Sequence, residues 1–282
     1  MQHLDLSDVL YPIINNRHLI YLTDYKSNIM KRISHIFIAA AFVAVSFNAS
    51  ASGRTGSDKA KHIEKSVIAS SVVQQDRNVK NFNGIAAGGP IEVIVTIGTT
   101  EGIKFEGDAE AISTLVTEVK GNILIIRPKT SWTSWSHKYE NKKIIARVSA
   151  KTISSLTMSG NGTLRVKGTV LATELATTLS GSGTIDANVN TDKLTSVISG
   201  SGSVNLTGKT DDANVTVSGS GKFNGTTLTM DNLNTRISGS GSVNVKVEDN
   251  IKALVSGSGR VNYSGNPNVD QRVIGSGGVT KI

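Results

Sequence analysis

A short glycine-rich tetrapeptide returns at nearly constant intervals through the second half of the chain. Its copies begin at Ser159, Ser180, Ser199, Ser218, Ser238 and Ser256, and a degenerate copy follows at Gly275-Ser276-Gly277. The steps between the leading serines are 21, 19, 19, 20 and 18 residues. A repeat of this length is typical of a solenoid, in which one repeat is one structural unit that needs its neighbours to bury its apolar face.

The residues around each tetrapeptide alternate between apolar and polar. Around Ser199, the apolar residues Leu194, Ile198 and Val204 all stand at odd distances from the serine. This period of two is typical of β-strands and directs the odd positions inward. The glycine pairs also stand at odd positions, where we expect the wall to bend because a side chain would clash with the core or force a disallowed φ.

We therefore expect an all-β fold, a right-handed parallel β-helix or solenoid with Ser-Gly-Ser-Gly repeats of about 19 residues. Glycine pairs and the enrichment in Thr, Val and Ser oppose helix in every copy. Coils stacked at roughly 4.8 Å pair every backbone amide with a neighbouring coil. The right hand follows because parallel crossovers are right-handed in about 98% of cases.

The part of the chain before the repeats also alternates, but without a fixed interval. Strand patterns cover 91–97, 103–105, 122–127 and 143–148, and residues 111–119 fit either one helical turn or another strand. We expect residues 79–150 to form an irregular, antiparallel-looking β cap with the first strands. Residues 151–282 then form the repeats, and 79–282 is one domain.

The first 78 residues carry a targeting pattern. Met30-Lys31-Arg32 is basic, residues 33–47 are mostly apolar, and Ala49-Ser50-Ala51 supplies small residues for cleavage. This order predicts a secretory signal peptide over 30–51, with a membrane anchor as the alternative. We expect residues 1–29 to be a mis-annotated extension and 52–78 to be a flexible linker. The protein is then exported, to the periplasm, the cell surface or the medium.

Composition narrows the choice of partner. The chain has no cysteine, so it has no disulfide framework and no lipid attached through a cysteine. The formal net charge is +8, but the Lys and Arg residues are scattered and no nucleic-acid motif accompanies them. We expect no nucleic-acid partner.

Two columns of polar residues recur with the repeat. The acidic column stands seven residues before the serine and comprises Asp192, Asp211, Asp231 and Asp249. Stacked carboxylates repel unless they are solvated or share a cation, so the column predicts either favoured turn residues or a Ca²⁺ site. The asparagine column stands six residues after the leading serine of each tetrapeptide and comprises Asn205, Asn224, Asn244 and Asn262. Stacked amides there can hydrogen-bond along the stack and fix the register, or form a polar ligand-binding face.

Both tryptophans of the chain lie in one polar segment, with Trp132 and Trp135 followed by Tyr139. Exposed aromatic rings can stack on sugars or fill a partner's pocket. The alternative is that the rings cover the end of the core. We name Trp132, Trp135 and Tyr139 as candidate ligand-binding residues.

Catalytic motifs are missing from the sequence. It holds no Gly-x-Ser-x-Gly, no His-Glu-x-x-His and no P-loop. Beyond the expected linker the only histidine is His137. We expect no enzymatic activity and no cofactor apart from the calcium option. The alternative is a polysaccharide lyase or hydrolase that acts on acidic glycans through carboxylates such as Asp186, Asp211, Asp212 and Asp231.

Several motifs resemble one known family. They are Phe82-Asn83-Gly84-Ile85, the strand 92–98, the turn Phe105-Glu106-Gly107-Asp108, Leu124-Ile125-Ile126 and the repeated tetrapeptide. Together they resemble the "putative auto-transporter adhesin, head GIN domain" (DUF2807), over residues 79–282. The resemblance implies a secreted or surface-exposed β-helix with an adhesin-like binding or scaffold role towards a glycan or the cell envelope. A purely structural envelope protein is a further possibility. The open strand edge at Val279 to Ile282 also predicts a homo-oligomer.

Overall fold

The computed structural model describes residues 72–130, 135, 137–139 and 142–282. The chain divides into two units, residues 1–62 and 63–282, and every described residue belongs to the second. The extension expected over 1–29, the signal peptide expected over 30–51 and most of the linker expected over 52–78 lie outside the described residues. Within the described part, no helix is long and apolar enough to cross a membrane.

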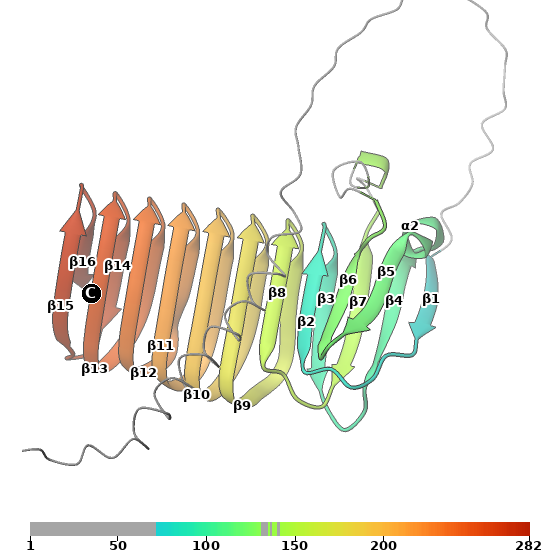
Figure 1. The fold of residues 1–282 in the computed structure, drawn as a ribbon, viewed down its shortest axis with the longest axis horizontal. Coiled ribbons are helices and arrows are strands. Elements are labelled where there is room, and N and C mark those ends of the chain that lie inside the picture. The colour runs from blue at the N-terminus through green and yellow to red at the C-terminus, as the bar shows by residue number, and fades with distance from the viewer. Residues whose placement is uncertain (1–71, 131–134, 136, 140–141) are drawn as a thin grey trace, which may run out of the picture. The chain divides into compact units, whose positions relative to one another are not determined.

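The repeats form a β-solenoid, as the spacing predicts. Five strands each run through most of one coil: β9 (Thr163–Gly181), β10 (Thr184–Gly200), β11 (Ser203–Gly219), β12 (Lys222–Gly239) and β13 (Ser242–Gly257). Successive strands pair in parallel, so the coils stand side by side (Figure 1). A last coil comprises β14 (Arg260–Ser264), β15 (Asn268–Ile274) and β16 (Gly278–Lys281).

The tetrapeptides line up at one corner of the coils. Ser199 pairs with Ser218 and Gly200 with Gly219, and the amide of Ser201 donates to the carbonyl of Gly181 at 2.9 Å. Unequal repeat lengths are absorbed away from this corner, because the register between β11 and β12 shifts between Asn205 and Thr207. The backbone ladder is therefore continuous where the glycines are, and bulges take up the extra residues elsewhere.

The core is narrow and is filled by the odd positions. The residue before each leading serine is fully buried, as Leu179, Ile198, Val217, Ile237 and Val255 show. A few hydroxyls are buried as well, and they pair between coils: Thr177 Oγ1 donates to Ser196 Oγ at 2.9 Å. Every buried side-chain polar atom of the described residues has a hydrogen-bond partner. The core therefore satisfies its polar groups although it is not wholly apolar.

On the N-terminal side of the repeats, the coil stack continues through segments that are distant from one another in sequence. The strand β2 (Gly84–Gly88) pairs in parallel with both β6 (Ile123–Pro128) and β8 (Ser155–Gly160). The strand β3 (Glu92–Ile97) pairs in parallel with both β7 (Ile144–Ala150) and β9. The strands β2 and β3, and likewise the strands β6 and β7, therefore form two further coils without the tetrapeptide.

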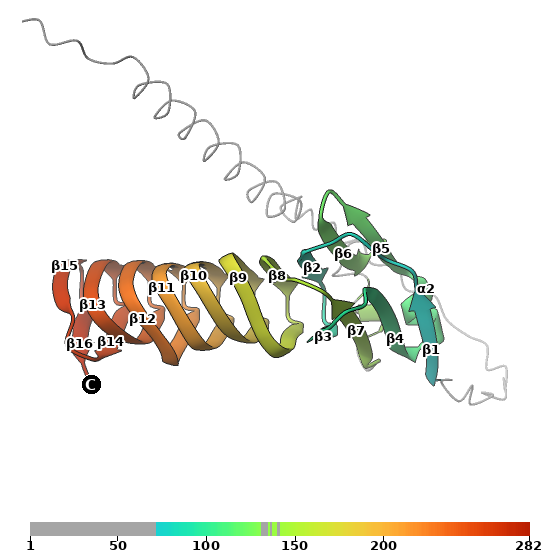
Figure 2. The ribbon, with the colours of Figure 1, turned by 90° about the horizontal axis from the view of Figure 1, so that it is seen from below.

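Antiparallel strands close the stack at the end away from the C-terminus (Figure 2). The strand β4 (Gly102–Asp108) pairs with β7 and with β1 (Val72–Arg77), while β5 (Leu115–Lys120) pairs with β6. A single helical turn, α2 (Ala109–Ser113), joins β4 to β5. The antiparallel expectation for residues 79–150 is therefore wrong for β2 and β3, which pair only in parallel, because alternation alone carries no information on strand direction. The strands β6 and β7 meet it on one side only, since each has one parallel and one antiparallel partner.

The C-terminal part of the expected linker is also corrected. Residues 72–77 of the span 52–78 form β1, which pairs with β4 over its whole length. Its last residue, Arg77, donates to the carbonyls of Ile112 and Leu115, each at 2.8 Å. The guanidinium also lies 4.7 Å from the ring centre of Phe105. This polar and apolar anchoring orders a segment whose composition resembles that of a linker.

Candidate functional site

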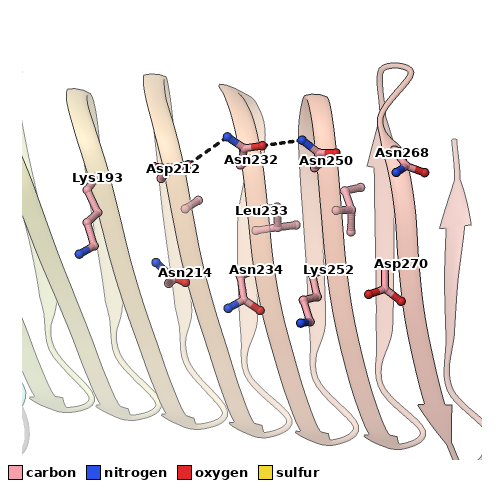
Figure 3. Close-up of a pocket in the computed structure, with 12 residues that line it drawn as sticks. Lys193, Asp212, Asn214, Asn232, Leu233, Asn234, Asn250, Lys252, Asn268 and Asp270 are labelled. Atoms are coloured by element: carbon pink, nitrogen blue, oxygen red, sulfur yellow. Dashed lines mark hydrogen bonds between the residues drawn. The ribbon is translucent and has the colours of Figure 1, made fainter. Parts of the chain in front are cut away.

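A shallow groove of about 480 Å³ runs across the outer surface of β10, β11, β12, β13 and β15 (Figure 3). We call it the amide groove. Its floor is the inward column Ala213, Leu233 and Ile251. Because side chains alternate along a strand, the residues on either side of this column point outward and form two polar walls.

The two walls hold polar residues at equivalent positions of successive coils, and asparagine recurs in both. One wall holds Lys193, Asp212, Asn232, Asn250 and Asn268, and the other holds Asn214, Asn234, Lys252 and Asp270. The register pairs Asp212 with Asn232, Asn232 with Asn250 and Asn250 with Asn268. Equivalent side chains are thus presented at the spacing of neighbouring strands, about 4.8 Å.

The first wall is internally hydrogen-bonded. Asn232 Nδ2 donates to Asp212 Oδ1 at 3.0 Å, and Asn250 Nδ2 donates to Asn232 Oδ1 at 2.9 Å (dashed lines in Figure 3). In the second wall, Asn234 and Lys252 are exposed and point into the open groove (Figure 3). One wall is therefore rigid, and the other offers unengaged donors and acceptors to a ligand.

The charges of the groove balance. Lys193 and Lys252 face Asp212 and Asp270 among the lining residues, and every other polar lining residue is a neutral amide. A surface of this kind has no strong preference for a polyanion or a polycation. It can exchange hydrogen bonds with a polar, neutral chain that runs across the coils.

Sequence reasoning missed the amide groove, although part of its signal is visible. The asparagines at positions six and four before the leading serine recur in register, as Asn232 and Asn250 do, or Asn214 and Asn234. The concave floor between the two walls is a property of the folded coil and has no counterpart in the residue pattern.

The asparagine column predicted after the tetrapeptide forms a partial ladder, with one hydrogen bond inside the column and one from its first residue to the preceding coil. Asn262 Nδ2 donates to Asn244 Oδ1 at 2.8 Å, and Asn205 Nδ2 donates to Asp186 Oδ1 at 2.8 Å. Asp186 in turn receives Arg165 at 3.1 Å. The confirmed hydrogen bonds support the register-fixing interpretation of this column.

The acidic column lies at one edge of the coils but is not gathered into a metal site. Asp211 stands level with Asp231, since their neighbours Thr210 and Asp212 pair with Met230 and Asn232. Asp211 makes an ion pair with Lys209 at 3.5 Å. Across residues 72–282, apart from the undescribed gaps, no group of three or more His, Cys, Asp or Glu side chains can hold a metal ion. The calcium prediction for Asp192, Asp211, Asp231 and Asp249 thus gains no support.

The aromatic segment is structural where it is described. Trp135 and Tyr139 are only 3% and 4% exposed, and their ring centres lie 5.1 Å apart. Trp135 Nε1 donates to Thr114 Oγ1 at 2.7 Å, and the Tyr139 hydroxyl donates to Glu110 Oε1 at 3.2 Å. The two rings pack against the α2 turn, which favours the alternative in which they cover the end of the core. The ligand-binding role of Trp135 and Tyr139 stays a prediction, and Trp132 lies outside the described residues.

Charged groups around α2 stabilise the same cap. Asp108 is the N-cap of α2, and the hydrogen bond that it accepts from the Ala111 amide lowers the pKa of its carboxyl, with Lys142 adding to the effect. Lys138 Nζ lies 2.6 Å from Glu110 Oε1 and lowers the pKa of the Glu110 carboxyl as well. These shifted groups all lie at the cap, far along the chain from the residues that line the amide groove.

The fold and the surface together define a class: an all-β solenoid that presents rows of polar side chains at a fixed spacing. The family model described as "Putative auto-transporter adhesin, head GIN domain" matches residues 81–267. The chain belongs to this family, as its motifs predict.

Solved structures with the same fold come from Bacteroides and Parabacteroides species. A "putative adhesin" from Bacteroides fragilis is 22% identical with a TM-score of 0.67, covering 75% of this chain and 97% of its own. A "putative adhesin" from Parabacteroides distasonis is 24% identical with a TM-score of 0.61, covering 76% and 98%. A "putative lipid binding protein" from the same species is 20% identical with a TM-score of 0.60, also covering 76% and 98%. No curated protein matches the chain.

Proposed function

We propose that this chain is an exported, non-catalytic adhesin-like protein of the cell envelope, and that it binds a neutral glycan across the amide groove. The observation that carries the proposal is the second wall of the groove. Asn214, Asn234 and Lys252 repeat at one spacing along the coils and leave polar groups open to a ligand. A sugar polymer carries hydroxyl donors and acceptors along its length and fits such an array.

Three of the four carboxylates named for a glycan-cleaving enzyme are engaged with other side chains. Asp186 is held by Arg165 and Asn205, Asp211 by Lys209, and Asp212 by Asn232. Among the described residues, the strands from β9 to β15 are joined by only two or three residues, so these connections supply no long loop that could close over a bound chain. This favours binding over the alternative of a polysaccharide lyase or hydrolase.

A glycan array tests the proposal, followed by affinity measurements on the best binder. We expect Asn234→Ala and Lys252→Ala each to weaken binding about fivefold, the effect of losing about 1 kcal/mol of hydrogen bonding. Lys222→Ala is the matched control, because Lys222 is an exposed lysine on β12 beyond the tetrapeptide corner.

Three results would count against the proposal. One is an array on which no glycan binds, and another is equal weakening by Lys222→Ala. The third is release of reducing sugar from the bound polymer, which would favour the enzyme. Because one structural neighbour is named a lipid-binding protein, liposomes serve as a further arm, and binding to them without glycan binding would replace the ligand class.

A further inference from the structure

The last coil of the solenoid is paired on one side only within the described residues. The strand β15 pairs with β13, and β16 pairs with β14. The inward residue Val273 is 37% exposed, although its equivalent one coil earlier, Val255, is fully buried. In addition, Ile274 occupies the position of the repeat serine and is 53% exposed. This end therefore exposes apolar side chains together with a free strand edge.

The residues of β15 are self-complementary about their centre. Gln271 is the middle residue of the strand Asn268–Ile274. On the outward face Asp270 and Arg272 flank this centre, and on the inward face Val269 and Val273 flank it. In an antiparallel self-pairing centred on Gln271, opposite charges face each other on one side of the sheet and valines face each other on the other side.

We propose that β15 pairs in antiparallel fashion with β15 of a second copy, and that the protein is a dimer joined through its last coils. Asp270 then lies opposite Arg272 of the partner subunit, and Val269 lies opposite Val273 of the partner subunit. The two copies of Gln271 meet on the two-fold axis, where each amide can donate to the other. The interface is isologous, so it closes after two copies.

Other arrangements of the same edge are less favourable. A parallel pairing in register would place Asp270 against Asp270 and Arg272 against Arg272, and like charges directly opposite are destabilising. Head-to-tail stacking would need an open coil at the other end, where β1, β4 and α2 cover the core. The other strand of the last coil, β16, ends at Lys281, whose Nζ bonds to Asn266 Oδ1 at 2.6 Å. A terminal lysine discourages further pairing of that strand.

Charge exchange within β15 tests the register. Sedimentation equilibrium should give a dimer for the wild type and a monomer for Arg272→Glu, which sets two acidic residues opposite each other. The double variant Asp270→Arg, Arg272→Asp keeps the charges complementary and should restore the dimer. Arg236→Glu, an exposed arginine two coils earlier in the same row as Arg272, is the matched control and should leave the dimer intact. Circular dichroism melts check that each variant remains folded.

A cysteine on the two-fold axis gives a second readout, since the chain has no cysteine of its own. We expect Gln271→Cys to form an intermolecular disulfide under mild oxidation, and Ser220→Cys on a distant corner not to do so. A wild type that stays monomeric at high concentration overturns the proposal. A dimer that survives Arg272→Glu, or that the double exchange does not restore, also overturns it.

Discussion

At the scale of single residues, the two glycines of each tetrapeptide meet two different demands. Gly200 has a φ of +119°, and a Cβ there would lie 2.5 Å from the Gly181 carbonyl oxygen. Gly202 has no such φ, but a Cβ there would collide with the Gly183 carbonyl oxygen and lie 2.7 Å from Leu179 Cδ2. Both glycines therefore permit close stacking of the coils, and the second also makes room for a core side chain.

Replacing Gly200 by Ala should lower the free energy of unfolding by about 2 kcal/mol or more. The added methyl group is strained by the backbone conformation and collides with backbone that cannot move independently. Ser201→Ala is the control, because Ser201 lies next to Gly200 and is exposed. It should change stability by less than about 0.5 kcal/mol. Urea unfolding measures both, and equal stability of the two variants would contradict the stacking argument.

Trp135 should matter for stability rather than for binding. Its ring is almost fully buried and its indole N–H bonds to Thr114, so Trp135→Ala should cost about 3–5 kcal/mol. Trp135→Phe keeps most of the apolar contact and should cost less. Thermal melting of both variants checks this order. A Trp135→Ala protein that melts like the wild type but loses its ligand would restore the binding interpretation.

At the scale of elements, the end of the stack near α2 depends on charged groups that the repeats do not use. Asp108 caps the helix, receives the Ala111 amide at 3.0 Å and pairs with Lys142 at 2.9 Å. Trp135 and Tyr139 cover the same turn. The short helix α2 is thus tied to the neighbouring coil by one capping carboxylate and two rings.

The contribution of Asp108 should depend on pH. Its pKa is lower in the folded protein than in the unfolded chain, so its stabilisation is complete above the ordinary aspartate range of about pH 4 and is lost as the pH falls through the folded pKa. Asp108→Ala should cost about 1 kcal/mol at pH 7. The difference from the wild type should shrink as the pH falls below the ordinary aspartate range. A difference that stays constant between pH 7 and pH 2 would contradict the assigned cause.

Elements also show where prediction from sequence succeeds and where it stops. The spacing of the tetrapeptides fixes β9 to β13, because each coil pairs with its neighbour in sequence. The partners of β2 lie about 40 and 70 residues further on, and nothing local in Gly84–Gly88 encodes them. The role of Trp135 is likewise not encoded locally. A tryptophan in a polar segment fits either a buried ring or a binding ring, and only the folded position of α2 distinguishes the two.

At the scale of the whole molecule, the coil stack has two unlike ends. One end is closed by antiparallel strands and a helical turn, and the other exposes β15 and β16. Between them, every outward row of side chains repeats from coil to coil. The same stacking produces the amide groove, the asparagine ladder and the free edge, so all three depend on the register of the tetrapeptides.

Disulfide trapping measures this register directly, because any cysteine introduced into the chain is the only one available. Ser201 and Ser220 occupy equivalent exposed positions on adjacent coils, one residue beyond the paired Gly200 and Gly219. The double variant Ser201→Cys, Ser220→Cys should form an intramolecular disulfide, since neighbouring strands lie about 4.8 Å apart and a disulfide spans Cα atoms about 4.4–6.8 Å apart. The double variant Ser201→Cys, Ser240→Cys places the thiols two coils apart, about 9.6 Å, and should stay reduced. Crosslinking of the second pair, or failure of the first in a folded protein, would contradict the stacked coils.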